Sequence, residues 1–171
     1  ATLIIPGPAP PGTKINRGPH FGAAPRRAEN RATGPPLVAN GDITDAASAR
    51  AALTASGAEA VMVGRAAQGA PWKLAEIAHG LHGTPAPDIP MGTARADLVA
   101  AHYEDMIGFY GTDVGLRVAR KHLGWYAEAA GVPMGKKALF AAASPAETLH
   151  VIRDLFADAP GAPLVPAGVA A

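Results

Sequence analysis

Residues 36–65 constrain the fold most, because they place a helical pattern between two short apolar runs. Residues 37–39 form the first run. Helical spacing follows, with Thr44 available as the N-cap and Gly57 as the C-cap. Residues 60–63 form the second run, which lacks polar alternation and therefore favours a strand that is buried on both faces. The order strand, helix, strand predicts two parallel strands joined by a helical crossover.

Each apolar run ends in a small polar turn, and the two turns carry the candidate ligand-binding residues. These are Asn40, Gly41 and Asp42 after the first run, and Gly64 and Arg65 after the second. Because the carboxyl ends of neighbouring parallel strands meet at one edge of a sheet, we expect the two turns to lie side by side. Backbone N–H groups and one guanidinium favour an anion such as phosphate. The alternative is an ordinary strand–helix–strand unit whose glycines only make tight turns.

A phosphate site of this kind is common in (β/α)8 barrels, where the loops after strands seven and eight and a short extra helix form it. Residues 66–79 have the pattern of such a helix and directly follow the second turn. Residues 36–83 therefore predict an α/β fold, namely the last two β/α units of a TIM (β/α)8 barrel. A Pro-rich linker at residues 84–92 follows.

The chain from residue 93 to residue 157 has a helical pattern throughout. Glycines and prolines divide it into helices at 93–110, 113–130 and 133–142, and a capping box at 144–147 (SPAE) starts a fourth helix. The apolar side of the first helix is expected to carry Leu98, His102, Asp105-Met106 and Phe109. Amphipathic helices with short connections predict a small antiparallel α-helical bundle.

The second of these helices carries a cationic face. Winding it at about 100° per residue places Arg117, Arg120 and Lys121 together, with Gly124 among them. Asp and Glu are absent from residues 114–127, so these cations have no partner at i±4 within that span. A cationic face with little bulk at Gly124 predicts contact with an RNA phosphate backbone. A solvated helix face is the alternative.

The histidines do not form a recognisable catalytic or metal-binding set. His122 stands beside the cationic face and away from the phosphate turns, so we expect it to contact RNA or to pack and not to transfer protons. His79 and His82 are expected to be polar residues at a helix end. The sequence therefore predicts no metal site.

Composition excludes several classes of protein. The net charge is +1, so any attraction to nucleic acid must be local. The absence of cysteine excludes a disulfide framework and a thiolate metal site, and it is compatible with a cytoplasmic protein. No run approaches the ~20 apolar residues of a membrane span, and no signal-peptide pattern is visible. We therefore expect a cytoplasmic protein that has no membrane partner.

Residues 1–35 are rich in Pro, Gly and Arg, and no periodicity survives beyond Leu3-Ile4-Ile5. A flexible linker and a basic arm that touches RNA are both compatible with this composition. We expect this segment to be disordered or to derive from an out-of-frame translation of a GC-rich gene.

Four motifs together resemble one family. ANGDI (39–43), VMVGRAAQGAPW (61–72), HYEDMIGFYG (102–111) and GLRVARKHLGWY (115–126) are similar to the bacterial tRNA-dihydrouridine synthases of the B type. The resemblance covers about residues 36–157. It implies a flavin enzyme with a (β/α)8 barrel followed by a helical domain that binds tRNA. It further implies that the phosphate of FMN is held by Asn40, Gly41, Asp42, Gly64 and Arg65, and that the RNA-binding residues are Arg117, Arg120, Lys121 and His122.

The resemblance also implies a reaction. Reduced FMN would transfer a hydride to C6 of a flipped-out uracil in tRNA, a cysteine would protonate C5, and NADPH would reduce the flavin. Because this sequence has no cysteine, we expect no catalytic residue in the chain and no activity of the chain alone. A non-catalytic RNA-binding fragment and a pseudogene product are the alternatives.

The expected organisation has five parts. Residues 1–35 are the disordered or out-of-frame segment, 36–83 the C-terminal piece of an FMN-binding barrel, 84–92 the linker, 93–157 the helical tRNA-binding domain and 158–171 a disordered tail. Two strands cannot close a barrel, so we expect the chain alone to be aggregation-prone at its strand edge, whereas the complete enzyme should be monomeric.

Overall fold

The computed structural model of the chain describes residues 2–4, 14–17 and 37–159. It consists of two compact units, residues 1–88 and residues 89–171, each with a hydrophobic core of its own. The boundary falls between Asp88 and Ile89, inside the segment that the sequence predicts as a linker. Within the described residues, no helix is both long enough and apolar enough to cross a membrane.

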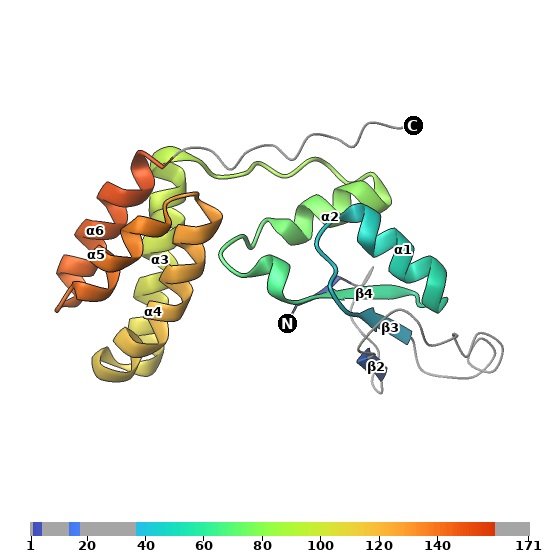
Figure 1. The fold of residues 1–171 in the computed structure, drawn as a ribbon, viewed down its shortest axis with the longest axis horizontal. Coiled ribbons are helices and arrows are strands. Elements are labelled where there is room, and N and C mark those ends of the chain that lie inside the picture. Colours follow the sequence, from blue (N-terminus) through green and yellow to red (C-terminus); the bar gives the residue numbers. More distant parts are fainter. Residues whose placement is uncertain (1, 5–13, 18–36, 160–171) are drawn as a thin grey trace. The chain divides into compact units, whose positions relative to one another are not determined.

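The first unit contains a four-stranded sheet in the order β1-β4-β3-β2 (Figure 1). Its strands are β1 (Thr2–Ile4), β2 (Lys14–Arg17), β3 (Leu37–Asn40) and β4 (Ala60–Val63). As predicted, β3 and β4 are parallel: Val38 lies opposite Ala60, and Asn40 lies opposite Met62. This confirms the α/β character of the segment.

Two of these strands lie in residues 1–35, where the sequence predicts no regular structure. β1 pairs antiparallel with β4, and β2 pairs parallel with β3. Strand pairing uses backbone groups that every residue carries, so such short strands need no periodic signal of their own. The structure therefore differs from the expectation at these segments. The rest of residues 1–35, and residues 160–171 of the expected tail, lie outside the described residues.

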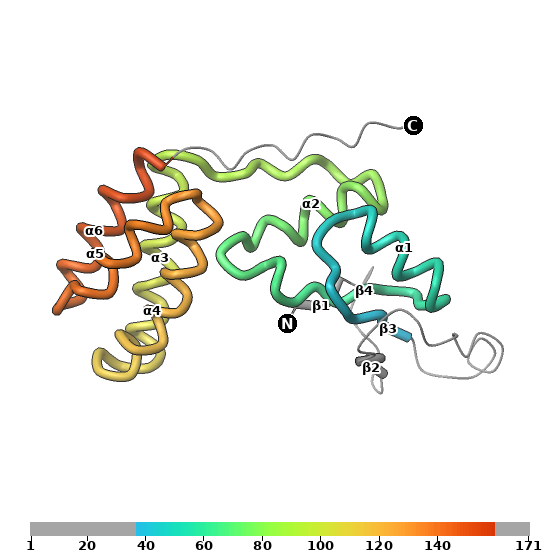
Figure 2. Tube along the Cα trace, viewed as in Figure 1, coloured from blue at the N-terminus to red at the C-terminus, as the bar shows by residue number. Residues whose placement is uncertain are grey.

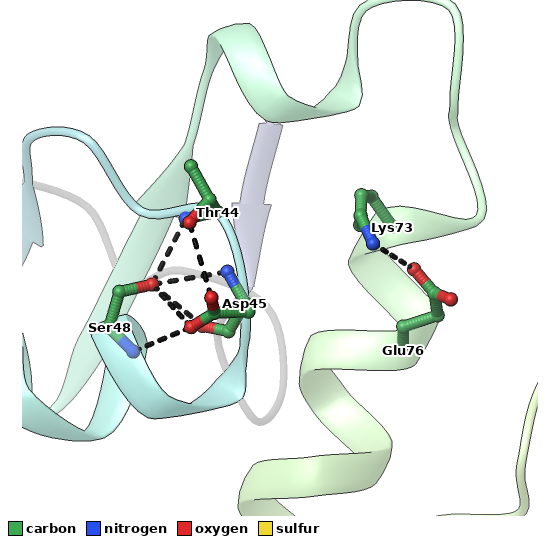
Figure 3. A network of polar contacts seen from close by, with 5 residues as sticks. All are labelled: Thr44, Asp45, Ser48, Lys73 and Glu76. Carbon is green, nitrogen blue, oxygen red and sulfur yellow. Dashed lines mark hydrogen bonds and ion pairs between the residues drawn. The ribbon is translucent and has the colours of Figure 1, made fainter. Parts of the chain in front are cut away.

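The crossover between β3 and β4 is the helix α1 (Ala46–Ser56). Asp45, and not the predicted Thr44, is its N-cap. The Asp45 carboxylate accepts the Ser48 N–H at 2.7 Å, and the Ser48 Oγ accepts the Asp45 N–H at 3.1 Å (Figure 3). This reciprocal pair is a capping box. Gly57 ends the helix with a left-handed φ of 66°, as predicted.

The helix predicted at residues 66–79 begins later than expected. A short 3-10 turn, η1 (Arg65–Ala67), comes first, and the helix α2 (Lys73–His82) follows it. Gly69 has a φ of 72°, which interrupts a right-handed helix, and Pro71 cannot donate the backbone hydrogen bond that a helix interior needs. The continuous helix was therefore the wrong prediction.

The helices α1 and α2 pack closely against each other, and their tubes lie side by side in Figure 2. A Cβ added at Gly80 would lie only 2.4 Å from the Cβ of Ala46. Beneath them the core of the unit is formed by Ala39, Ile43, Ala49, Ala52, Val61, Val63 and Ile77.

The second unit is an α-helical bundle, as predicted. Its elements are α3 (Gly92–Tyr110), α4 (Thr112–Ala129), η2 (Pro133–Gly135), α5 (Lys136–Ala141) and α6 (Pro145–Ala157). Helix α3 packs against both α4 and α6. At the start of α6, Ser144 caps the helix by accepting the Glu147 N–H at 3.2 Å, whereas the Glu147 carboxylate accepts the N–H of Ala143 and not that of Ser144.

The buried stripe of α3 matches the predicted one only in part. Met106 is buried as predicted, but the unpredicted Val99 and Tyr103 are buried too, and Phe109 is 82% exposed. A Cβ at Gly115 of α4 would lie 3.0 Å from the Ile107 Cα, so α4 covers that side of the last turn of α3. The side that carries Phe109 is left uncovered within the described residues.

Candidate functional site

The loops after β3 and β4 enclose a pocket of about 670 Å³. It is lined by Asn40, Gly41, Asp42, Ile43, Thr44, Gly64, Arg65 and Ala66. The structure thus brings together in one pocket all five residues that the sequence predicts for a phosphate. The cause is the parallel pairing of β3 and β4, which places both C-terminal loops on the same edge of the sheet.

The backbone of the first loop has an unusual conformation. Gly41 has a φ of 145°, and Asp42 has a φ of 42°. Asp42 is the one non-glycine residue with a positive φ among residues 2–4, 14–17 and 37–159. Asp tolerates this region better than most residues because its short polar side chain can hydrogen-bond locally. The chain therefore turns sharply where β3 ends, and the Asp42 side chain faces the second loop.

Asp42 and Arg65 join the two loops across the pocket. The Arg65 guanidinium donates a hydrogen bond to the Asp42 carboxylate and forms an ion pair with it. The Arg65 and Asp42 side chains are 82% and 69% exposed. An ion pair as exposed as this contributes about 0–1 kcal/mol, so an anionic ligand can replace the carboxylate at little cost.

Gly64 and the 3-10 turn η1 complete the wall on the β4 side. A Cβ added at Gly64 would meet no other atom within 4 Å, so the space beside this backbone is open. A phosphate can approach a glycine backbone more closely than any other backbone. The donor set, one guanidinium and glycine-containing loops, therefore suits a phosphate group.

Sequence reasoning missed three residues that line the pocket. Ile43 is 3% exposed and belongs to the core of the first unit, and Ala66 belongs to η1. Thr44 donates its N–H to the Ser48 Oγ at 3.1 Å (Figure 3). Ile43 directly follows the predicted Asp42, Ala66 directly follows the predicted Arg65, and Thr44 comes one residue later than Ile43, so closeness in the sequence was the available signal. The prediction excluded them because it considered only groups that bind anions.

The cationic face predicted on α4 is present on the second unit. Arg117, Arg120 and Lys121 are all exposed. Within the part of the chain that the structure describes, none of them forms an ion pair. The Lys121 Nζ lies 5.0 Å from the centre of the Trp125 ring, a distance at which a cation–π attraction operates.

Gly124 does not have the role that the sequence suggests. It is buried, and a Cβ added there would lie 3.2 Å from the Cζ of Phe140 on α5. The glycine allows α5 to approach α4 and offers no close approach to a phosphate backbone. The expectation failed because the sequence pattern of α4 does not reveal which neighbouring helix covers which side.

His122 packs among aromatic rings at the edge of the cationic face. Its ring centre lies 5.4 Å from that of His102 and 5.0 Å from that of Trp125. Burial lowers the pKa of His122, and the positive charges that His102 and Lys121 can carry lower it further. His102 in turn lies 3.0 Å, through Nδ1, from the hydroxyl of Tyr126. The contacts of His122 agree with the predicted packing role, and its contact with RNA stays a prediction.

The histidines of the described residues do not form a metal-binding cluster. Among the described residues, no group of three or more His, Asp or Glu side chains is placed to hold a metal ion. His79 contacts the carbonyl oxygen of Thr84 just past the end of α2.

Comparison with known proteins gives the family. The model of the family described as Dihydrouridine synthase (Dus) matches residues 29–159. A probable tRNA-dihydrouridine synthase of Rhodobacter capsulatus is 58% identical over 123 residues, which are 72% of this chain and 38% of that protein. The tRNA-dihydrouridine synthases B of Serratia marcescens and of Escherichia coli K12 are 48% and 46% identical over 101 residues.

These B-type relatives are matched by 58% of this chain, over 30% and 31% of their own lengths. The chain thus spans about a third of the length of the curated relatives that it matches. The family match, in contrast, covers most of the chain, including both loops of the pocket and the whole helical bundle. The chain therefore belongs to the dihydrouridine synthase family.

Proposed function

We propose that this chain provides the phosphate end of an FMN site and a tRNA-binding helical unit of a tRNA-dihydrouridine synthase, in which β3, α1, β4 and the following helix are the last two units of a (β/α)8 barrel. The observation that carries the proposal is the pocket after β3 and β4. Asn40, Gly41, Asp42, Gly64 and Arg65 come from two separate segments, and all of them line it.

The residues of this pocket would bind and orient the cofactor through its phosphate. The Arg65 guanidinium would donate charge-assisted hydrogen bonds to phosphate oxygens, and backbone N–H groups of the glycine-containing loops would add neutral ones. Asp42 would hold the Arg65 guanidinium over the pocket until the phosphate replaces the Asp42 carboxylate as its partner. When bound and reduced by NADPH, FMN would supply the hydride for reduction of a uracil in tRNA.

The chain itself would not complete the reaction. In the proposed scheme a cysteine protonates the base, and none of the 171 residues is a cysteine. The role of the pocket is therefore binding and orientation, and we assign no catalytic residue to this chain. We expect the pure polypeptide to form no dihydrouridine in tRNA; product detected by mass spectrometry would overturn this assignment.

The helical unit would contribute affinity for tRNA. Arg117, Arg120 and Lys121 are exposed cations of one helix, and no ion pair within the described residues neutralises them. Phosphate contacts by such cations release counterions, so the binding should weaken strongly with salt. His122 would support this face by packing against Trp125.

An FMN titration of the full chain tests the pocket. Arg65→Ala removes the charged donor and should weaken binding by about 1.5–3 kcal/mol, or roughly ten- to a hundredfold. Arg153→Ala is the matched control, because Arg153 is an exposed arginine of α6 in the other unit. If the Arg65 variant and the control bind FMN with equal affinity, the phosphate does not bind at Arg65.

A tRNA titration at several KCl concentrations tests the helical face. Replacing Arg117, Arg120 and Lys121 together with Gln should lower the slope of log K against log[salt] by about two to three units, at roughly 0.9 per lost contact. Gln preserves the helix, because its helix propensity is close to those of Arg and Lys. A triple variant that remains helical by circular dichroism and keeps the original slope would show that the cationic face is only solvated surface.

A further inference from the structure

Two exposed aromatic residues end α3, next to the turn that leads into α4. This turn is the yellow corner of the bundle in Figure 1. Phe109 is 82% exposed and Tyr110 is 47% exposed. Their ring centres lie 4.8 Å apart, and the rings are inclined at 82°, which is an edge-to-face arrangement. Val114, at 41% exposure, is a further exposed apolar residue and lies in the first turn of α4. Neither ring belongs to the core of the bundle, so this surface is available to a ligand.

The corner that carries the rings is held tightly. Gly111 alone separates α3 from α4, and its φ of 74° allows the sharp turn. Just beyond it, a Cβ at Gly115 would lie 3.0 Å from the Ile107 Cα and 3.1 Å from the Met106 carbonyl oxygen. The two backbones therefore touch directly. A ligand that binds rings on such a corner orders little chain, which lowers the entropic cost of binding.

The charge around the rings indicates the kind of ligand. Val114, Arg117 and Lys121 follow one another at spacings of three and four residues and so share one face of α4. Measured along the helix axis, Arg117 lies about 5 Å and Lys121 about 10 Å from Val114. The charged residues closest to the rings in sequence are the carboxylates Asp105, four residues before Phe109, and Asp113, three residues after Tyr110. The surface thus pairs an apolar aromatic end with a cationic stripe that starts one helical turn away.

We infer that the Phe109–Tyr110 pair is a stacking platform for an unpaired nucleobase of bound RNA, whose backbone phosphates reach Arg117 and Lys121. This rests on the proposed tRNA binding of the helical unit and names the part of the RNA that it reads. Aromatic side chains stack on any base with a free face, and only bases outside a duplex have one. The acidic neighbours disfavour phosphate at the rings themselves, so the contact there is stacking and not ion pairing.

Variants of Phe109 in the full chain test the platform. Phe109→Leu keeps an apolar side chain but removes the π face, and it should weaken binding of an unmodified tRNA transcript roughly 5- to 150-fold. Phe109→Trp should retain the wild-type affinity. Because stacking involves no phosphate, the salt slope should stay unchanged in both variants, whereas loss of Arg117 should lower it. Binding to a blunt RNA duplex without unpaired bases should be the same in the wild type and in the two Phe109 variants.

Met134→Leu is the matched control, since Met134 of η2 is 89% exposed in the same unit and should not affect binding. Phe109→Leu with wild-type affinity for tRNA would overturn the platform while leaving the proposed function intact, provided that the triple Gln variant still weakens binding. A wild-type chain that binds no tRNA would overturn both. If Phe109→Leu instead converts a dimer to a monomer in sedimentation without changing RNA affinity, the rings form a protein contact and the platform is wrong.

Discussion

The Arg65 guanidinium donates a hydrogen bond to the Asp42 carboxylate, and this contact links the loops that follow the two parallel strands of the first unit. The two residues are 23 positions apart in the sequence, yet both line the same pocket. Asp42 reaches its partner from a backbone with a φ of 42°. The contact therefore depends on the backbone conformation of Asp42 as well as on its charge.

The conformation and the charge of Asp42 can be separated by two substitutions. Asp42→Gly removes the carboxylate but fits the positive φ, so it should lower the free energy of unfolding by at most about 1 kcal/mol. Asp42→Ala removes the same carboxylate and adds strain, so it should cost about 1–2 kcal/mol more. Urea denaturation measures both values. Equal losses in the two variants would show that the φ of this loop is not a constraint.

The capping box of α1 predicts a pH-dependent contribution to stability. The backbone hydrogen bond from Ser48 is the main cause of the lowered pKa of Asp45. Because the pKa of Asp45 is lower in the folded chain, its ionised carboxylate stabilises the fold at pH values above 3.8, the pKa of the unfolded chain. This stability is lost as the pH falls through the folded pKa. Asp45→Ala should cost about 1 kcal/mol at pH 7 and much less at pH 2.

Asp45→Asn is the control for this effect, because Asn caps helices about as well as Asp but does not titrate. Its stability should vary less with pH than that of the wild type between pH 5 and pH 2, roughly the range over which a lowered carboxyl pKa acts. An Asp45→Ala variant that remains equally destabilised at both pH values would contradict the assignment of the cap to the carboxylate.

His122 should make the stability of the fold depend on pH nearer neutrality. Its pKa is lowered mainly by burial, so the unfolded chain takes up a proton at the ordinary value of 6.5 while the folded chain resists it. Stability should therefore be full above pH 6.5 and fall as the pH drops below it. In His122→Gln this decline should be smaller. An NMR titration of His122 with a pKa above 6.5 would refute the argument.

Two glycines of the α3–α4 pair should respond to alanine in opposite directions. A Cβ at Gly108 would meet nothing within 4 Å, so Gly108→Ala should stabilise α3 by about 0.5–1 kcal/mol through its better helix propensity. At Gly115 the Cβ would meet the Ile107 backbone at 3.0 Å, so Gly115→Ala should destabilise by about 1–3 kcal/mol. Thermal unfolding of the two single variants checks both signs.

The sequence alone determined the local structure and the residues of the pocket. Helical spacing located α1, α3, α4 and α6, and an apolar run without alternation located β4. Asn40 to Asp42 and Gly64-Arg65 could be placed together because parallel strands with a single crossover leave no other arrangement for their loops. These features follow from interactions over a few residues or from topology, and both are encoded in sequence pattern.

The tertiary structure decided which side of each element is covered. The patterns of α3 and α4 suggested a buried Phe109 and an accessible Gly124, whereas the structure has Phe109 exposed and Gly124 beneath Phe140. The same holds for β1 and β2, which pair with strands that are distant in the sequence. Periodicity reports that a helix has an apolar side, but the packing of neighbouring helices decides where that side ends.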